Sequence, residues 1–270
     1  MKILLNNDDL NEALYNVRNV GFVPTMGSIH KGHLSLIKKS LNECNRTIVS
    51  IFVNPTQFNN KNDYKKYPRN FKKDLIILKK LNVDFVYLPS IRDVYSSKRL
   101  NKIKIDKKNQ ILCAKFRKGH FEGVIDVMDR LTTLIKPNKI FMGEKDFQQL
   151  YLLKKYLKKI YRSKIIRCKT IREKNKLALS SRNLRLTKTQ LIKASKLIKN
   201  IMNIKKNFKK KDNFNKILYY KKKDLSKLYN VKIEYLEFRN MKNLKLSNKL
   251  KNSKIFLAYY LDKVRLIDNF

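Results

Sequence analysis

Short apolar runs alternate with stretches of helical spacing over the first two thirds of the chain. Each run is short enough for a buried strand, and the runs lie at 20–23, 47–53, 85–88, 139–142 and 164–168. In the stretches between them, apolar residues recur three and four positions apart, as on one buried helix face, over 34–41, 70–81, 123–135 and 146–161. This alternation predicts βα units arranged around a parallel sheet, which is an α/β fold.

The pattern changes after Arg172. Thr187 and Gln190 have the spacing of a capping box, which predicts the start of a lysine-rich helix that continues to about residue 206. A second helical stretch and three strand-like runs follow, at 214–228, 231–238, 255–261 and 264–267. We therefore predict two domains, an α/β domain at 1–172 and a smaller α+β domain at 173–270.

The composition fits a folded chain without a membrane partner. Hydrophobic residues make up 43% of the 270 residues, and no run approaches the roughly 18 to 20 apolar residues that a membrane span requires. The N-terminal segment becomes polar and acidic at residues 6–9, too early for a secretory signal. Cys44, Cys113 and Cys168 lie far apart without metal-site spacing, which favours free thiols in a reducing compartment. We expect a cytoplasmic protein.

The formal net charge of +43 has two explanations. A strongly basic protein often binds nucleic acid or an anionic membrane. Here most of the 64 basic residues are lysines, spread along the whole chain among many Asn and Ile residues. A/T-rich codons encode all three residue types. We therefore favour base-composition drift over a nucleic-acid partner and expect no specific nucleic acid.

The stretch 24–33 carries the most distinctive chemistry. It lies between the first predicted strand and a helical pattern, so it is a strand-to-helix turn. The N-terminus of a helix attracts anions, and Gly27 and Gly32 let a ligand approach the backbone. His30 and His33 are two of the three histidines in the chain, and their spacing places both on one helix face. Together these features predict a phosphate site.

A second polar segment, 54–58, directly follows the strand predicted at 47–53. Ligands of open α/β sheets bind beyond the carboxyl ends of the strands, so polar groups there are expected to face the crevice. The amide of Gln57 can both donate and accept hydrogen bonds, which suits a substrate with hydroxyl and carboxylate groups. By itself the segment fits a plain turn equally well.

A third polar segment, 143–149, follows the strand predicted at 139–142 and opens a helix. Lys145 offers a positive charge to a phosphate, and Asp146 offers an acceptor to ribose hydroxyls. Gln149 lies one turn into the helix. The alternative is that Asp146 caps the helix while Lys145 is solvated.

A fourth segment, 179–183, lies near the predicted domain boundary. The hydroxyls of Ser180 and Ser181, followed by Arg182, form a compact set of donors for phosphate oxygens. A loop at this place could close over a bound nucleotide, although a surface turn explains the segment equally well. Two further polar segments, 117–123 and 67–69, are candidates for lining the same pocket.

Taken in order, these segments resemble the pantoate–β-alanine ligase family of the HxGH nucleotidyltransferase superfamily. The matches span nearly the whole chain, and although each motif alone is weak, the ordered set is highly specific. The matching pieces are Pro-Thr-Met-Gly-x-x-His-x-Gly-His at 24–33, Ser-Ile-Phe-Val-Asn-Pro-Thr-Gln-Phe at 50–58, Tyr-Pro-Arg at 67–69, Gly-His-Phe-x-Gly-Val at 119–124, Gly-Glu-Lys-Asp-Phe-Gln-Gln-Leu at 143–150, Leu-Ala-Leu-Ser-Ser-Arg-Asn at 177–183 and Arg-Leu-Ile-Asp-Asn at 265–269.

The resemblance implies a Rossmann-like N-terminal domain, a smaller C-terminal domain that acts as a lid, and a homodimer. It implies that ATP and pantoate form pantoyl adenylate and pyrophosphate, after which the amine of β-alanine releases AMP and gives pantothenate for coenzyme A synthesis. ATP is a co-substrate, and Mg²⁺ accompanies it through the phosphates, so we assign no protein ligand to the metal. The acyl adenylate is already activated, so no covalent enzyme intermediate is expected.

The resemblance also assigns residues. His33 is the implied proton donor, and His30 and Lys145 complete the catalytic set. Gln57 is implied to hold pantoate and β-alanine, and Gln149 to hold pantoate. The implied ATP site consists of Met26, Gly27, Ser28, Ile29, His30, Lys31, Gly32, His33, Gly143, Glu144, Lys145, Asp146, Ile171, Leu179, Ser180, Ser181 and Arg182.

Several positions depart from the family pattern. Lys31 adds positive charge where the family is acidic or small. Asn175 and Lys176 replace an Asp-Gly turn, and asparagine tolerates a left-handed backbone. The loop around 110–120 also differs, with Cys113 and Ala114 in place of a Glu-Gly pair and Lys118 in place of proline.

Two alternatives stay open. One is another HxGH nucleotidyltransferase, such as a mononucleotide adenylyltransferase, although the motifs around Gln57 and Gln149 argue against it. The other is a basic RNA-binding protein that keeps the fold, which predicts salt-sensitive binding to nucleic acid.

Overall fold

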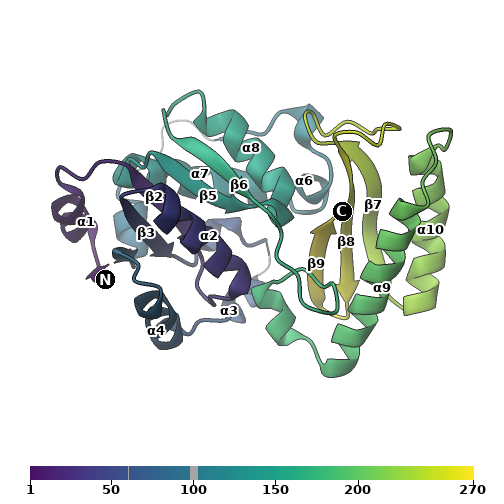
Figure 1. Cartoon of the computed structure of the whole chain (residues 1–270), viewed down its shortest axis with the longest axis horizontal. Coiled ribbons are helices and arrows are strands. Elements are labelled where there is room, and N and C mark those ends of the chain that lie inside the picture. The colour runs from purple at the N-terminus through teal and green to yellow at the C-terminus, as the bar shows by residue number, and fades with distance from the viewer. Residues whose placement is uncertain (60, 98–102) are drawn as a thin grey trace. The chain divides into compact units, whose positions relative to one another are not determined.

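The computed structural model describes residues 1–59, 61–97 and 103–270. Two compact units divide the chain (Figure 1): Met1–Lys107 joins Arg117–Thr170 in the first, and Lys108–Phe116 joins Ile171–Phe270 in the second. The chain therefore passes between the units three times. No pattern in the sequence indicates that residues 108–116 group with the C-terminal half.

The first unit is built on a parallel sheet that has six strands among the described residues, in the order β1-β4-β3-β2-β5-β6. Five of the strands confirm the predicted ones. The unpredicted strand, β1, is only three residues long and buries only Leu4, so it carries no alternating pattern. The bounds are β1 (Lys2–Leu4), β2 (Val20–Thr25), β3 (Arg46–Ile51), β4 (Phe85–Tyr87), β5 (Lys139–Gly143) and β6 (Lys164–Cys168).

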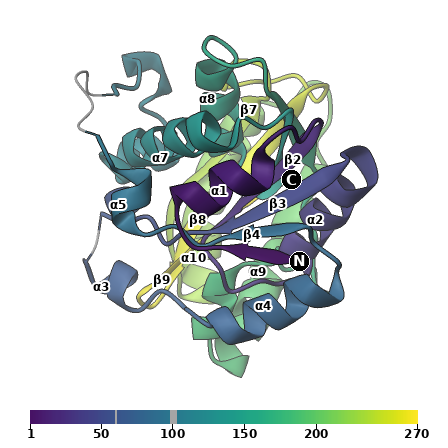
Figure 2. The same ribbon diagram turned by 90° about the vertical axis from the view of Figure 1, so that its left-hand side faces the viewer.

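Helices cover both faces of this sheet (Figure 2). On one face, Leu36 and Ile37 of α2 and Leu78 of α4 pack against Val23 and Val49 of the strands. The other face is covered by α1, α5, α7 and α8. The helices of this unit are α1 (Asn7–Leu14), α2 (Lys31–Glu43), α3 (Lys61–Lys65), α4 (Phe71–Lys80), α5 (Ile91–Val94), α7 (His120–Ile135) and α8 (Phe147–Leu157), with 3-10 turns η1 (Pro55–Gln57) and η3 (Glu144–Asp146).

The strand order reverses at β2, which lies between β3 and β5. From β2 the chain adds β3 and β4 on one side of the sheet, whereas β5 and β6 lie on the other side. In open α/β sheets, ligands bind beyond the carboxyl ends of the strands at such a switch point. The three segments that follow β2, β3 and β5 therefore occupy the edge where a ligand is expected.

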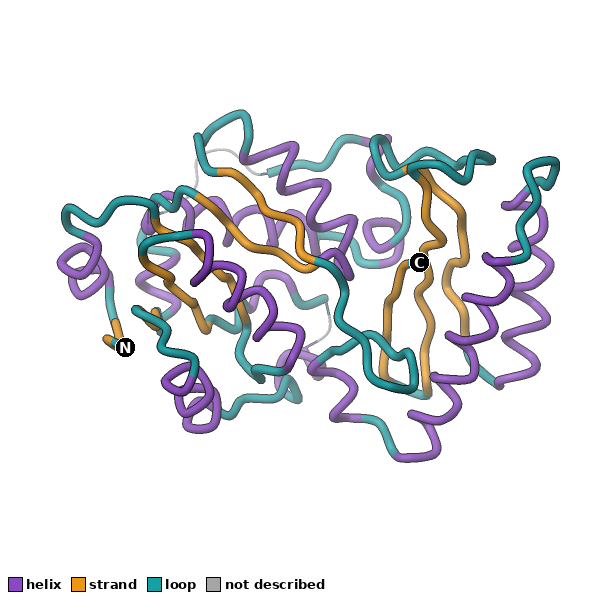
Figure 3. The backbone as a smooth tube through the Cα atoms, in the orientation of Figure 1, coloured by secondary structure: helices purple, strands orange, loops and turns teal. Residues whose placement is uncertain are grey.

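The second unit contains an antiparallel sheet of β7 (Lys232–Asn240), β8 (Ser253–Leu261) and β9 (Val264–Asn269), as the strand-like runs predict. Its three strands follow one another in sequence, whereas helices alternate with strands in the first unit. Figure 3 shows the strands in orange and the helices in purple. The helices are α9 (Lys188–Lys206) and α10 (Phe214–Tyr229), with α6 (Cys113–Phe116) and the 3-10 turns η2 (Lys107–Asn109) and η4 (Ser181–Arg185). The predicted fold class, a parallel α/β sheet followed by a smaller α+β part, is confirmed.

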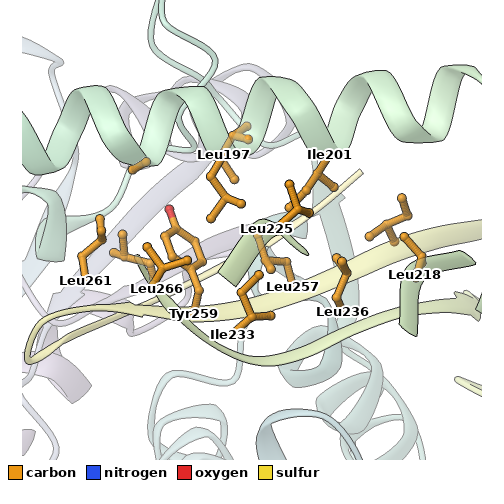
Figure 4. Packing of buried hydrophobic residues seen from close by; sticks show 14 of the residues in the cluster. Leu197, Ile201, Leu218, Leu225, Ile233, Leu236, Leu257, Tyr259, Leu261 and Leu266 are labelled. Atoms are coloured by element: carbon orange, nitrogen blue, oxygen red, sulfur yellow. The ribbon is translucent and has the colours of Figure 1, made fainter. Parts of the chain in front are cut away.

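The core of the second unit lies between its sheet and its two long helices. Figure 4 shows Leu197 and Ile201 of α9 facing strand residues such as Leu257. Thr187 Oγ1 accepts from the Gln190 N–H at 3.2 Å, and Gln190 Oε1 accepts from the Thr187 N–H at 2.8 Å. The predicted capping box of α9 is therefore present. None of the described helices combines the length and apolar composition needed to cross a bilayer.

Candidate functional site

The turn between β2 and α2 confirms the predicted strand-to-helix connection. Thr25 Oγ1 donates to the Ser50 carbonyl at 2.8 Å and accepts from the Gly27 N–H at 3.1 Å. Gly27 (φ 78°) and Ser28 (φ 54°) are both left-handed, so the chain reverses sharply before His30, the N-cap of α2. Glycine adopts this conformation without steric cost, which explains Gly27.

The carboxylate of Asp74, which the sequence analysis does not single out, accepts hydrogen bonds from the backbone of this turn. Both oxygens of Asp74 accept backbone N–H groups at 2.7 Å, Oδ2 from Ser28 and Oδ1 from Ile29. Asp74 lies in the first turn of α4 and is 2% exposed. The available signal was an acidic residue on the apolar face of the helix predicted at 70–81.

The backbone of the turn offers fewer donors to a ligand than the sequence suggests. We expected an anion site from unpaired N–H groups at the start of α2. In Gly27–His33, however, the N–H groups of five residues bond to Thr25, Asp74, His33 or His30. The His33 N–H also bonds to the His30 side chain in the capping box of α2. Within the described structure, only the N–H group of Lys31 in this turn therefore remains for a ligand. Side chains must supply the remaining donors.

The two histidines stack on each other and share one hydrogen-bonding pattern. Their ring centroids are 4.0 Å apart with an interplanar angle of 18°. Nδ1 of His30 accepts from the Gly32 N–H at 3.1 Å, and Nδ1 of His33 accepts from the His30 N–H at 3.4 Å. A nitrogen that accepts carries no proton, so each neutral ring bears its proton on Nε2. Each imidazole therefore offers an Nε2–H donor.

The surroundings keep both rings neutral. Burial, followed by the positive charge of Lys145, lowers the pKa of His30 to about 4. Burial, His30 and Lys145 lower the pKa of His33 well below its usual 6.5. Near neutral pH both rings are therefore neutral Nε2–H donors rather than cations, and Lys145 carries the positive charge.

These lowered pKa values make stability depend on pH. Between pH 6.5 and about 4, an unfolded chain binds protons at His30 and His33 that the folded protein excludes. Stability is thus fully present above pH 6.5 and falls as pH drops, with a slope of up to about 1.4 kcal/mol per pH unit for each histidine.

We expect His30→Asn, whose Oδ1 can replace Nδ1 as the cap acceptor, to lose part of this slope. Urea unfolding at pH 7 and pH 5 measures the difference between wild type and variant. Identical pH dependence in the two proteins would contradict the pKa assignment.

The segment after β5 brings Lys145 and Asp146 into electrostatic contact with His30. Glu144 lies beside Arg167 instead, with 3.5 Å between Oε1 and Nη1. Asp146 occupies the N-cap position of α8 without a side-chain capping bond, so the capping alternative finds no support. Gln149 lies in the first turn of α8, as predicted.

The segment after β3 presents Gln57 next to the histidine turn. The Gln57 amide contacts Sδ of Met26 through Nε2, and its Oε1 accepts from Asn54 Nδ2 at 3.4 Å. Asn54 is 1% exposed and also donates to the Gly123 carbonyl at 3.2 Å, while its Oδ1 accepts from the Tyr95 hydroxyl at 2.8 Å. The structure thus brings the Gln57 side chain into contact with Met26, while the buried Asn54 side chain donates to the Gln57 amide oxygen.

Residues from the 117–123 segment fix the backbone of Gln57. His120 Nδ1 donates to the Gln57 carbonyl at 2.7 Å, while Arg117 Nη1 donates to His120 Nε2 at 2.8 Å. A Cβ atom on Gly123 would lie 2.5 Å from the Thr56 carbonyl oxygen, so only glycine lets α7 approach this loop. In the structure, the 117–123 segment supports the loop that carries Thr56 and Gln57.

The 67–69 segment also packs against the loop after β3. The buried ring of Tyr67 meets Phe58 edge-on at a centroid distance of 5.6 Å. Arg69 donates to the Tyr64 carbonyl at 3.3 Å and lies over the Tyr64 ring. These contacts position the residues that follow Gln57.

The remaining predicted ATP-site residues belong to the second unit. Ile171 and Leu179 face each other across a short hairpin, in which the Leu179 N–H donates to the Ile171 carbonyl at 3.0 Å. Ser180 caps η4 by accepting from the Arg182 N–H at 3.3 Å, and Ser181 is buried. Within this unit the structure therefore groups Ile171, Leu179, Ser180, Ser181 and Arg182.

The tip of this hairpin places its left-handed residue one position later than expected. We expected Asn175 to tolerate the left-handed backbone, but Lys176 has the positive φ, 76°, and Asn175 Oδ1 instead accepts from the Leu177 N–H at 3.0 Å. The Lys176 carbonyl accepts from Arg172, which also holds Asp268 through two bonds of 2.7 and 2.8 Å. The tip of the hairpin therefore carries a strained, left-handed lysine.

Lys176→Gly is expected to stabilise the protein by up to about 1 kcal/mol. The left-handed backbone costs a non-glycine residue about 1–2 kcal/mol, and the greater chain entropy of glycine returns part of this gain. Urea unfolding checks the result, with Lys174→Gly as a control that lacks a positive φ and is expected to destabilise. Equal shifts in the two variants would contradict the strain at Lys176.

Known proteins resemble this chain over its full length. The family model for pantoate-beta-alanine ligase matches residues 2–270. Pantothenate synthetase of Francisella tularensis subsp. mediasiatica is 42% identical over 267 residues, covering 97% of this chain and 92% of the relative. Pantothenate synthetase of Azobacteroides pseudotrichonymphae is 38% identical over 281 residues, covering 100% and 99%.

Solved structures agree with these relatives. Pantothenate synthetase from Thermus thermophilus superposes with a TM-score of 0.93 at 29% identity, covering 100% of this chain and 99% of that one. Pantoate-beta-alanine ligase from Francisella tularensis, complexed with beta-gamma ATP and beta-alanine, gives a TM-score of 0.85 at 40% identity, with coverage of 100% and 97%. The chain that carries the stacked histidines and the supported Gln57 therefore belongs to the pantoate–β-alanine ligase family.

Proposed function

We propose that this protein condenses pantoate with β-alanine in two steps driven by ATP. In the first, a carboxylate oxygen of pantoate attacks the α-phosphorus of ATP, the bond to the bridging oxygen breaks, and pyrophosphate leaves. In the second, the amine of β-alanine attacks the acyl carbon of pantoyl adenylate, releasing AMP and pantothenate after loss of a proton. The stacked pair of neutral histidines beside Lys145, at the switch point of the sheet, carries the proposal.

The first step needs alignment and stabilisation of negative charge more than covalent chemistry. Nε2–H of His30 and His33 can donate to phosphate oxygens, and Lys145 can neutralise charge on the departing pyrophosphate. Because both rings are neutral, His33 is proposed to donate a hydrogen bond from Nε2–H to a phosphate oxygen. The proton-donor role that the resemblance implies for His33 would require the protonated ring, which the lowered pKa disfavours near neutral pH. The ATP site is proposed to include the other residues of 26–33 and 143–146. The resemblance also assigns Ile171 and 179–182 to ATP binding and implies that the C-terminal domain serves as a lid.

Gln57 and Gln149 are the proposed pantoate ligands, with Gln57 also contacting β-alanine. An amide can donate to the carboxylate and accept from a hydroxyl of the same substrate. Asn54 and His120 fix Gln57 through its side chain and its backbone, which supports a role that requires a defined orientation. The activated acyl phosphate reacts directly with the amine, so this account needs no enzyme nucleophile.

Mg²⁺ is proposed only as a companion of the ATP phosphates. The described residues contain no group of three or more His, Cys, Asp or Glu side chains that could hold a metal ion. The donor set at the turn is basic, which suits phosphates and not a cation. By resemblance the metal is held through the ATP phosphates, so we assign it no protein ligand and derive no step through it.

A homodimer and a cytoplasmic location complete the proposal. The homodimer follows from the family resemblance, and the three cysteines, which are free thiols, favour a reducing compartment such as the cytoplasm.

Product analysis tests the proposed reaction. With pantoate, β-alanine, ATP and Mg²⁺, we expect pantothenate and AMP to form in equal amounts, identified by mass spectrometry. Formation of ADP in place of AMP would contradict adenylation, and AMP formation independent of pantoate would point to another nucleotidyltransferase.

A further inference from the structure

We infer that Asp74 is a positioning residue for the phosphate-binding turn, acting through the backbone to set the two histidines. The inference rests on the proposed function, because it deepens the account of the same site. Asp74 lies outside every motif that identifies the site by resemblance. It reaches the turn from α4, more than forty residues later in the chain.

The geometry ties Asp74 to the residues immediately before His30. Its carboxylate accepts from the N–H groups of Ser28 and Ile29 at 2.7 Å each, both short for bonds of this kind. Ser28 is left-handed, a conformation that costs a non-glycine residue about 1–2 kcal/mol. The two charge-assisted bonds can offset that cost, so they hold the turn in the conformation that starts α2 at His30.

Gly27 and Asp74 depend on each other. A Cβ atom on Gly27 would lie 3.0 Å from Asp74 Oδ2 and 3.0 Å from Ile51 Cγ2. Glycine is thus required both for the positive φ and for the close approach of the carboxylate. The carboxylate also lies in the first turn of α4, where the helix dipole favours negative charge.

A buried carboxylate near a site for a triphosphate is electrostatically unfavourable, so its presence calls for hydrogen bonds that a neutral side chain cannot make. Asp74 presents two acceptors to two donors, and it is 2% exposed, so water cannot replace either bond. Asparagine has nearly the same shape but offers only one acceptor, and its NH₂ group would face a backbone N–H. Asp74→Asn therefore removes one bond and creates a clash of donors with almost no change in volume.

Asp74→Asn is expected to lower the maximal rate of pantoate-dependent ATP–pyrophosphate exchange by about 10²-fold, because a small misplacement of catalytic groups has effects of that size. The KM for pantoate, which binds through other residues, is expected to change less than threefold. NMR titration of the histidine rings should show the pKa of His30 rising from about 4 towards 6.5 as the turn loosens.

Asp84→Asn is the matched control. Asp84 accepts the Thr47 N–H at 2.8 Å and lies 3.4 Å from Arg46 Nη1, so the same substitution removes a carboxylate charge that faces a backbone N–H at the amino-terminal end of β3, away from the turn. The control is expected to lose stability but to keep the maximal rate and the titration of His30. If the two variants lose rate equally at matched folded fractions, or if Asp74→Asn keeps the wild-type rate, the inference is overturned.

Gly27→Ala provides a second route if Asp74→Asn does not fold, because its methyl group presses on the same carboxylate. The same loss of maximal rate with a retained KM for pantoate is expected, and wild-type kinetics would overturn the inference. If the wild-type protein shows no exchange activity, the proposed function is rejected. That outcome differs from the ones that overturn only the role of Asp74.

Discussion

His33→Asn is expected to lower pantoate-dependent ATP–pyrophosphate exchange by about 10²–10³-fold while leaving the fold intact. The reason lies in the two nitrogens of the ring. Nδ1 of His33 accepts the His30 N–H at 3.4 Å, and the Oδ1 atom of asparagine can take over that bond. Asparagine has no group at the position of Nε2–H, so the variant removes only the donor that we assign to the ATP phosphates.

His33→Ala serves as the comparison, because it removes the donor and the capping acceptor together. We expect the two variants to lose similar activity, and only the alanine variant to lose about 1 kcal/mol of stability, as is typical when a helix cap is removed. Exchange rates and urea unfolding measure the two effects. An asparagine variant with near wild-type exchange would show that the Nε2–H of His33 is not needed for adenylation.

Lys145→Met is expected to have a comparable effect on exchange, about 10²–10³-fold, through loss of positive charge at the departing pyrophosphate. Lys145 also contributes, after burial, to the lowered pKa values of His30 and His33. Its removal should therefore raise both pKa values, which NMR titration of the three histidines can measure. A loss of rate together with raised histidine pKa values is the expected signature.

Lys154→Met is the control for Lys145→Met. It removes one charge from the same segment of the chain, at an exposed position on α8. Since the protein carries a net charge of +43, a general attraction for polyanions would survive either substitution. We expect Lys154→Met to keep the wild-type exchange rate. Equal losses of exchange in the two variants would mean that Lys145 acts only through the net positive charge of the protein.

Hydrophobic periodicity predicts the elements of this fold well where they are long or fully buried. The strand predicted at 164–168 has the same bounds as β6, and the helix predicted at 214–228 ends one residue before α10. Short elements such as β1 and α5 escape prediction because three or four residues contain too few buried positions to form a pattern. The membership of 108–116 in the second unit rests on contacts between segments far apart in sequence, such as that between Cys113 and Tyr235.

The chemistry of the site is only partly visible in the sequence. Spacing identifies His30 and His33, because two ligand-type residues on one helix face leave a local signature. It cannot reveal their tautomers or their lowered pKa values, which depend on the burial and on Lys145, more than a hundred residues away. Asp74 and Asn54 act through buried hydrogen bonds to other segments, so only the folded structure displays their roles.

The central claim is that an acyl adenylate forms before the amine reacts, and isotope exchange in the absence of β-alanine tests it most directly. The protein is incubated with ATP, Mg²⁺, labelled pyrophosphate and pantoate, and label is followed into ATP. We predict rapid exchange that depends on pantoate and stops when pantoate is omitted. No exchange at saturating pantoate, or exchange that requires β-alanine, would contradict the account.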